Sequence, residues 1–348
     1  MKLTRLLIII FSIVILFPIS SFGYEEPWDS VERRTRPIKT KRKIIKHRIK
    51  SVNKKRSMPF KVILPRDYEI DKERRYGVVL YLCGLSGAKR GSGSYPVYFS
   101  IWCKLPRTLD NLYKGKLTKK SLAWKVTDSE LKEFNDKLAE DSFEDFIAVD
   151  LWHPSASRDL NWDKFVVEEL LPFLDKNYRT IPKREFRAID GACGGGAIAL
   201  ITAFRNPEAF GNCGGMQTDL GTFPNTFKFF KENRDRIVAN PLNVNLNTNK
   251  NDVCNDYYFR NSKDAEGNKI KVPRGAHARL EVLLKEAGCN VQVKVFRHCK
   301  HGYSAYRYAN GHHTSYFHGK IFKKHRMAMQ GDKPEIKVDK TEEVKLNK

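Results

Sequence analysis

One short stretch of the chain combines a reactive side chain with the small residues that can hold it in a tight turn. Cys193 stands between Gly191 and Gly195, after the strand-like segment 186–189 and before the apolar segment 197–204. This spacing predicts a strand, a sharp turn that presents the thiol, and a helix. A nucleophile on such a turn crowds the positions two residues before and after it, and glycine relieves that crowding. The alternative is a glycine-rich loop beside a buried structural cysteine.

The elements around this turn predict an α/β fold with one doubly wound, mostly parallel sheet. The continuous apolar run 76–82 is typical of a central parallel strand, which is buried on both faces, and 146–151 is expected to be the next parallel strand. Further strands are expected at 58–65, 244–248 and 291–296, and helices at 163–178, 197–204 and 275–287. Residues from about 89 to 140 fit no core element, so we expect an insertion over the site. Strands that alternate with helices in this way indicate a single sheet.

Several blocks of sequence between about residue 43 and residue 322 resemble one family of enzymes. The blocks are 60–65, 81–87, 168–179, 187–195 and 206–211. Together they resemble the putative-esterase family of α/β-hydrolases. That family includes esterase D (S-formylglutathione hydrolase), feruloyl and acetyl-xylan esterases, enterochelin esterases and mycolyltransferases. The resemblance implies the α/β-hydrolase fold and the hydrolysis of a carboxylic ester.

The resemblance also implies that nucleophile, acid and histidine follow one another in that order along the chain. The histidine is then expected in the loop after the last strand, where His301 precedes a glycine and a tyrosine, with His298 as the competitor. The acid is expected just past the strand that follows the nucleophile helix. Asp252 stands there, and Asp256 in the same loop is the alternative.

A triad of Cys193, His301 and Asp252 would cleave an ester through an acyl-enzyme. His301 takes the thiol proton, the thiolate attacks the carbonyl carbon, and Asp252 holds the tautomer of the imidazole. The backbone N–H groups of Gly194 and Leu85 are expected to form the oxyanion hole. The family usually carries serine where this chain has cysteine, but the related dienelactone hydrolases use a cysteine at this turn.

The N-terminal residues 1–23 are typical of a signal peptide. A short positive segment precedes the apolar run 6–19, and the small residues Ser21 and Gly23 allow cleavage before Tyr24. An uncleaved membrane anchor is the alternative. We therefore expect an exported protein, periplasmic or extracellular, with a basic N-terminal segment (24–42), an esterase-like domain (43–325) and a disordered charged tail (326–348).

The formal net charge of +24 is concentrated near the mature N-terminus. A basic segment of this kind can bind an anionic polymer or a membrane surface. Nucleic acid is not an expected partner of an exported protein. The alternative is a solvated edge strand that its lysines protect from pairing with other chains.

The seven cysteines are an odd number. If Cys193 is a free nucleophile, six remain whose disulfide pairing the sequence does not determine: Cys83, Cys103, Cys213, Cys254, Cys289 and Cys299. No pair of cysteines has zinc-ribbon spacing and no cofactor motif occurs, so we expect neither a metal nor a cofactor. A metal held by Cys299 and His301, or by His312, His313 and His318, is the alternative to ordinary loop and helix surface, which we favour.

These observations together predict an exported carboxylic ester hydrolase that acts through Cys193, His301 and Asp252. The ester substrate is expected to be extracellular or linked to a polysaccharide. Two alternatives stay open. The chain could be an inactive α/β-hydrolase-fold protein that binds an acidic polymer, or an acyltransferase in which an alcohol replaces water.

Overall fold

The computed structural model describes most of the region expected to form the domain. The described residues are 38–84, 98–122, 126–151, 161–221, 223–250, 252, 254, 257–263, 269–297, 301–302 and 309–331. The predicted signal peptide, most of the basic segment, Leu85, Asp256, His298 and the tail beyond residue 331 lie outside them. Within the described ranges, no helix has both the length and the apolar character needed to cross a membrane.

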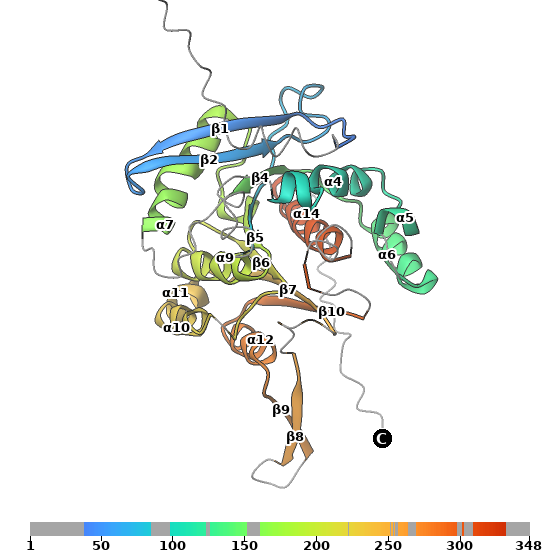
Figure 1. Ribbon diagram of the computed structural model, residues 1–348, viewed down its shortest axis with the longest axis vertical. Coiled ribbons are helices and arrows are strands. Elements are labelled where there is room, and N and C mark those ends of the chain that lie inside the picture. Colours follow the sequence, from blue (N-terminus) through green and yellow to red (C-terminus); the bar gives the residue numbers. More distant parts are fainter. Residues whose placement is uncertain are drawn as a thin grey trace, which may run out of the picture.

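In the described part of the chain, eight strands form one sheet in the order β1-β2-β4-β3-β5-β6-β7-β10 (Figure 1). The strands are β1 (Ile44–Ser51), β2 (Arg56–Ile63), β3 (Val78–Leu82), β4 (Ile147–Leu151), β5 (Arg187–Gly191), β6 (Asn212–Met216), β7 (Asn243–Asn249) and β10 (Asn290–Phe296). The β1–β2 and β2–β4 pairs are antiparallel, whereas the other neighbours are parallel. This confirms the predicted doubly wound, mostly parallel sheet.

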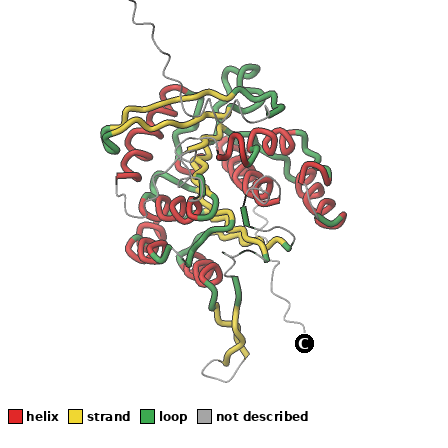
Figure 2. Tube along the Cα trace, in the orientation of Figure 1, coloured by secondary structure: helices red, strands yellow, loops and turns green. Residues whose placement is uncertain are grey.

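Helices cover both faces of the sheet (Figure 2). They are η2 (Tyr98–Trp102), α4 (Leu105–Tyr113), α5 (Lys119–Leu122), α6 (Asp128–Glu140), α7 (Asn161–Lys164), η3 (Phe165–Leu170), α8 (Leu171–Asn177), η4 (Arg184–Phe186), α9 (Gly194–Arg205), α10 (Asn225–Glu232), α11 (Arg234–Ala239), α12 (Ala276–Glu286) and α14 (Ala309–Met329). Successive residues of β3 alternate between two cores because side chains of a strand alternate between faces. Leu80 belongs to the core cluster that contains residues of η3, α9 and α12, and Tyr81 belongs to the cluster that contains residues of η2, α4 and α14.

The segment expected to be an insertion over the site is partly a layer of the fold. Phe99, Leu105 and Leu109 are buried against the same sheet face as Phe322 of α14. In the sequence, these apolar residues recur at helical spacing and are separated by polar residues. The buried face of the helix was therefore not recognised among the charged residues of the segment. Helix α6, in contrast, buries only Leu138 and is otherwise largely exposed. The expectation is therefore corrected for η2 and α4.

Several other elements were not predicted from the sequence, among them β6 and an antiparallel hairpin. Strand β6 occupies the interior of the sheet although two of its five residues are glycines. Strands β8 (Phe259–Lys263) and β9 (Lys269–Pro273) form a separate antiparallel hairpin that projects from the body of the molecule (Figure 1).

Structural elements lie across two of the predicted segment boundaries, those after residues 42 and 325. Arg42, assigned to the basic segment, has a fully buried side chain. Its guanidinium donates two hydrogen bonds to Asp145, of 3.0 and 2.8 Å, and one of 3.1 Å to Asp110. At the other end, α14 continues to Met329, past the expected start of the tail at 326. Strand β1 lies at the edge of the sheet, as expected for the alternative in which this basic region forms a solvated edge strand.

Candidate active site

Cys193 lies on a sharp turn between β5 and α9, as the sequence pattern predicts. Its backbone has φ 54° and ψ −123°, a combination that costs a non-glycine residue on the order of 1–3 kcal/mol. Two backbone hydrogen bonds hold the turn. The Cys193 N–H donates to the Met216 carbonyl at 2.9 Å, and the Ala192 N–H donates to the Leu82 carbonyl at 3.0 Å. The thiol is thereby fixed at the carboxyl ends of β3, β5 and β6.

The two flanking glycines are required by close contacts between backbone segments. A Cβ on Gly191 would overlap the backbone of Gly195, and a Cβ on Gly195 would overlap the carbonyl oxygens of Leu82 and Cys83. The sequence pattern correctly marked both positions. The crowding comes from the backbone of the turn and of β3, however, and not from the side chain of the nucleophile.

His301 and Asp252 come together beside this turn, although 49 positions separate them in the sequence. The Nδ1 nitrogen of His301 is 2.8 Å from Oδ1 of Asp252. The carboxylate side chain is fully buried, whereas 28% of the imidazole side chain is exposed. The backbone N–H of Gly302 donates to Oε1 of Gln217 at 3.0 Å, which anchors the histidine loop next to the end of β6.

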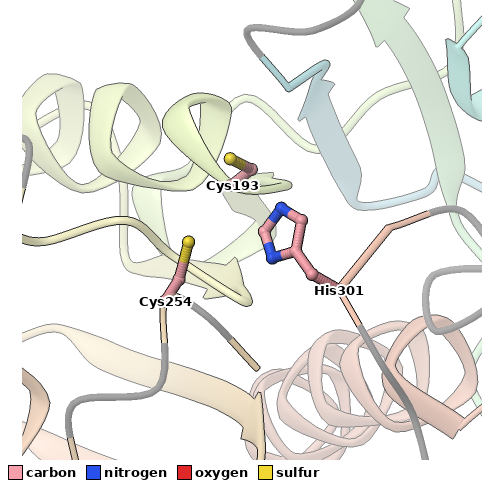
Figure 3. Close-up of side chains that lie close together, drawn as sticks. All are labelled: Cys193, Cys254 and His301. Carbon is pink, nitrogen blue, oxygen red and sulfur yellow. The ribbon is translucent and has the colours of Figure 1, made fainter. Parts of the chain in front are cut away.

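A second thiol, that of Cys254, belongs to the same cluster. The Sγ atoms of Cys193 and Cys254 and a ring nitrogen of His301 all lie within 4.8 Å of one another (Figure 3). The Cys254 N–H donates to Oδ1 of Asp252 at 2.7 Å, so the oxygen that holds the histidine also holds this cysteine. Sequence reasoning placed Cys254 only among the six remaining cysteines. Its position two residues after Asp252 was the available signal.

This environment favours the thiolate form of Cys193. Hydrogen bonding from Cys254 and from the His301 imidazole, together with the imidazolium charge, lowers the pKa of Cys193 to about 5 against the opposing effect of burial. Hydrogen bonds to Asp252 and to Cys193 raise the pKa of His301 to about 10. The two groups therefore form a thiolate–imidazolium pair around neutral pH. The hydrogen bond to Cys193 and burial raise the pKa of Cys254 itself, which stays a protonated thiol.

The first residue of α9 adds a further donor. The backbone N–H of Gly194 donates toward the Cys193 sulfur. The N-terminus of a helix carries partial positive charge, which favours a thiolate there. The Gly194 N–H thus lies where an oxyanion donor was expected. The second expected donor, Leu85, lies outside the described residues.

A buried contact between a histidine and an aspartate of hydrogen-bond length lies next to the turn. Nε2 of His318, on α14, is 2.9 Å from Oδ2 of Asp190, and both side chains are fully buried. Asp190 also accepts a hydrogen bond from the Gly191 N–H through Oδ1 at 2.7 Å. His318 was interpreted as helix surface, and this is wrong because α14 packs against the sheet. His312 and His313 are likewise buried, at 1% and 8% exposed.

Four described cysteines, two of them in the site, are thiols. Within the described ranges, Cys193, Cys213, Cys254 and Cys289 are free of disulfide bonds. Burial raises the pKa of Cys213 well above its ordinary range, and burial also raises that of Cys289. Cys193 is therefore the cysteine whose environment favours nucleophilic chemistry among these four.

Comparisons with known proteins agree with this architecture. A family model described as "Putative esterase" matches residues 51–328. A search of curated proteins found no match.

Solved structures with a similar fold include an esterase and a hydrolase. A ferulic acid esterase has a TM-score of 0.55 and 16% sequence identity, over 81% of this chain and 99% of that one. An S-formylglutathione hydrolase from Staphylococcus aureus has a TM-score of 0.50 and 13% identity, over 81% of this chain and 98% of the other.

Proposed function

Because this chain belongs to the putative esterase family and is a carboxylic ester hydrolase with the α/β-hydrolase fold, we propose that Cys193 is its nucleophile. In this proposal His301 is the general acid and base, and Asp252 is the residue that orients it. The observation that carries the proposal is the convergence of these three side chains at the turn before α9.

The first half-reaction begins from the thiolate–imidazolium pair. The Cys193 sulfur forms a bond to the ester carbonyl carbon, and the carbonyl oxygen becomes an oxyanion stabilised by the Gly194 N–H. When the tetrahedral intermediate collapses, the bond to the alkoxy oxygen breaks. The leaving alcohol takes its proton from Nε2 of His301, and the acid part stays on Cys193 as a thioester.

Water completes the cycle. Neutral His301 removes a proton from water, whose oxygen attacks the thioester carbonyl, and the thiolate leaves as the carboxylic acid is released. Asp252 keeps Nδ1 protonated, so that Nε2 faces the reacting groups in both half-reactions. An alcohol that occupies the water position would instead give acyl transfer.

The fixed ion pair at Cys193 is the reason to prefer catalysis to an inactive binding protein. A buried carboxylate that orients the imidazole, and a thiol whose pKa lies below neutral pH, are features that inert structural cysteines lack. Export, supported by residues 1–23, and an extracellular or polysaccharide-linked acyl ester are parts of the same proposal. The similarity to a ferulic acid esterase makes feruloyl esters the first candidates to test.

The test compares Cys193→Ala with Cys289→Ala, which changes a buried thiol elsewhere. Hydrolysis of a short-chain chromogenic ester and of a feruloyl sugar ester is followed with the reduced enzyme, and the acyl-enzyme is sought as an added mass. We expect Cys193→Ala to lose turnover and acylation, whereas Cys289→Ala retains both. Full turnover in Cys193→Ala would exclude the proposed nucleophile. Acylation followed by sugar ester synthesis, in place of hydrolysis, would assign the acyltransferase reaction.

A further inference from the structure

We propose that Cys193, Cys254 and His301 form a binding site for a thiophilic divalent cation such as Zn²⁺, and that the bound cation blocks the nucleophile. Among the described residues, these three are the only group of His, Cys, Asp and Glu side chains whose ligand atoms converge in this way. They come from three separate segments of the chain and face a common space (Figure 3).

The spacing of the three ligand atoms fits tetrahedral coordination. Zn²⁺ binds sulfur at about 2.3 Å and imidazole nitrogen at about 2.0–2.1 Å, which places ligand atoms roughly 3.6–3.8 Å apart in a tetrahedron. The three atoms lie within 4.8 Å of one another, so a movement of about 1 Å or less completes the site. A disulfide between the two cysteines requires their sulfurs to approach to about 2.05 Å, a larger change.

The ligand chemistry selects soft cations. Two sulfurs and one imidazole suit Zn²⁺, whereas Mg²⁺ and Ca²⁺ require oxygen ligands. Two thiolates and a neutral imidazole balance the charge of a divalent cation. Binding therefore displaces the proton of Cys254 and the Nε2 proton of His301 to solvent, while Cys193 is already a thiolate.

The site is preorganised by Asp252. Its Oδ1 accepts hydrogen bonds from Nδ1 of His301 and from the Cys254 backbone, and so fixes two of the three ligands. A carboxylate on the far nitrogen of a metal-binding histidine is a common arrangement that orients the ring and strengthens the ligand. The third ligand, Cys193, is held by its backbone hydrogen bond to Met216.

The same geometry lets a cation enter the site from solvent and determines how the bound cation affects catalysis. All three ligands are partly exposed, so a cation can reach them from solvent. With three protein ligands, the fourth position stays open to water or another ligand. A cation on the sulfur and on Nε2 removes the nucleophile and the base together. This inhibitory half of the inference rests on the proposed function, whereas the binding half does not.

The test of binding uses Co²⁺ as a spectroscopic probe on the reduced full-length protein. Wild type and the control Cys289→Ser are expected to bind one Co²⁺ per chain with thiolate charge-transfer bands and intense visible bands of tetrahedral coordination. Zn²⁺ should displace the probe. Cys254→Ser and Cys193→Ala should each weaken binding by at least about 100-fold, beyond the roughly 10–100-fold cost of losing an outer partner. Circular dichroism confirms that each variant is folded.

Two results overturn the site: absence of the charge-transfer band in wild type, or equal affinity in Cys254→Ser and Cys289→Ser. Ester turnover is measured separately in excess chelator, and then with added Zn²⁺. If the enzyme turns over ester in chelator and added Zn²⁺ does not reduce that turnover, the inhibitory half of the inference is refuted. No turnover in chelator, together with a normal Co²⁺ spectrum, counts against the proposed function and leaves the cation site standing.

Discussion

Replacing Cys254 with alanine isolates its effect on the proton equilibrium of Cys193. The Cys254 thiol is the largest contributor to the low pKa of Cys193, which is about 5 in the site. A hydrogen bond to a charged group contributes about 1.5–3 kcal/mol. Since one pKa unit corresponds to about 1.36 kcal/mol, Cys254→Ala should raise the pKa of Cys193 to roughly 6–7.

This change predicts a loss of activity that depends on pH. The pKa of Cys193 is lowered in the enzyme, so the thiolate is present above about pH 5 and is lost as the pH falls through that value. At pH 5.5 about three quarters of the wild-type sites carry the thiolate, against about a tenth if the pKa is roughly 6.5. We therefore expect about an eightfold lower kcat/KM at pH 5.5 and little change at pH 8.

The assay measures the rate of alkylation of Cys193 by iodoacetamide as a function of pH, with the modified residue identified by mass spectrometry. The pH dependence of kcat/KM is recorded in parallel, in excess chelator. Cys289→Ala is the matched control and should keep both profiles. If the alkylation midpoint of Cys254→Ala stays near pH 5, the assignment of the hydrogen bond between the thiols is refuted.

Three further changes have expected outcomes. Asp252→Asn removes the carboxylate that raises the pKa of His301 to about 10, so the imidazolium should be lost nearer pH 6.5, seen by NMR titration of the ring protons. Gly195→Ala forces a Cβ into two carbonyl oxygens at the end of β3. It should lower the free energy of unfolding by about 1–3 kcal/mol and reduce turnover. Arg42→Ala leaves two carboxylates unpaired and should cost about 3–5 kcal/mol in urea denaturation.

Matched substitutions test the causes assigned to these effects. Gly221→Ala adds a Cβ whose nearest neighbour lies 3.9 Å away. It should change the free energy of unfolding far less than Gly195→Ala does. Lys72→Ala breaks an exposed ion pair with Glu69 and should change stability by at most about 1 kcal/mol. A stability loss in either control as large as in its partner would contradict the steric or electrostatic reasoning. For Asp252→Asn, an unchanged titration of His301 would contradict the assignment of its raised pKa to the carboxylate.

The parts of the fold that the sequence predicted are those with a strong local pattern. Strand β3 is a continuous apolar run, strand β4 is apolar except for Asp150, and the Cys193 turn carries glycines at both required positions. Strand β6 was missed because Gly214 and Gly215 carry no apolar side chain, although both are fully inside the sheet. What places glycine there is the close approach of Asp190 and Thr218, which no local pattern records.

For the site, only the order of the nucleophile, the acid and the histidine along the chain could be predicted. The resemblance to a family supplied candidates for the acid and the histidine, and the structure brings Asp252 and His301 together. Cys254 was not predicted because its role depends on a contact with Cys193, 61 positions away in the sequence, and not on a motif. The burial of His318 was missed for a similar reason, since its partner Asp190 lies on a distant strand.

The single carboxylate oxygen shared by His301 and Cys254 makes the two inseparable. Oδ1 of Asp252 sets where the proton carrier sits and also where the neighbouring sulfur sits. Any displacement of the short segment after β7 must therefore move both relative to Cys193. Redesign of the acid–base behaviour through Asp252 would alter the second thiol as well, whereas a change at Cys254 itself leaves the anchor of the histidine in place.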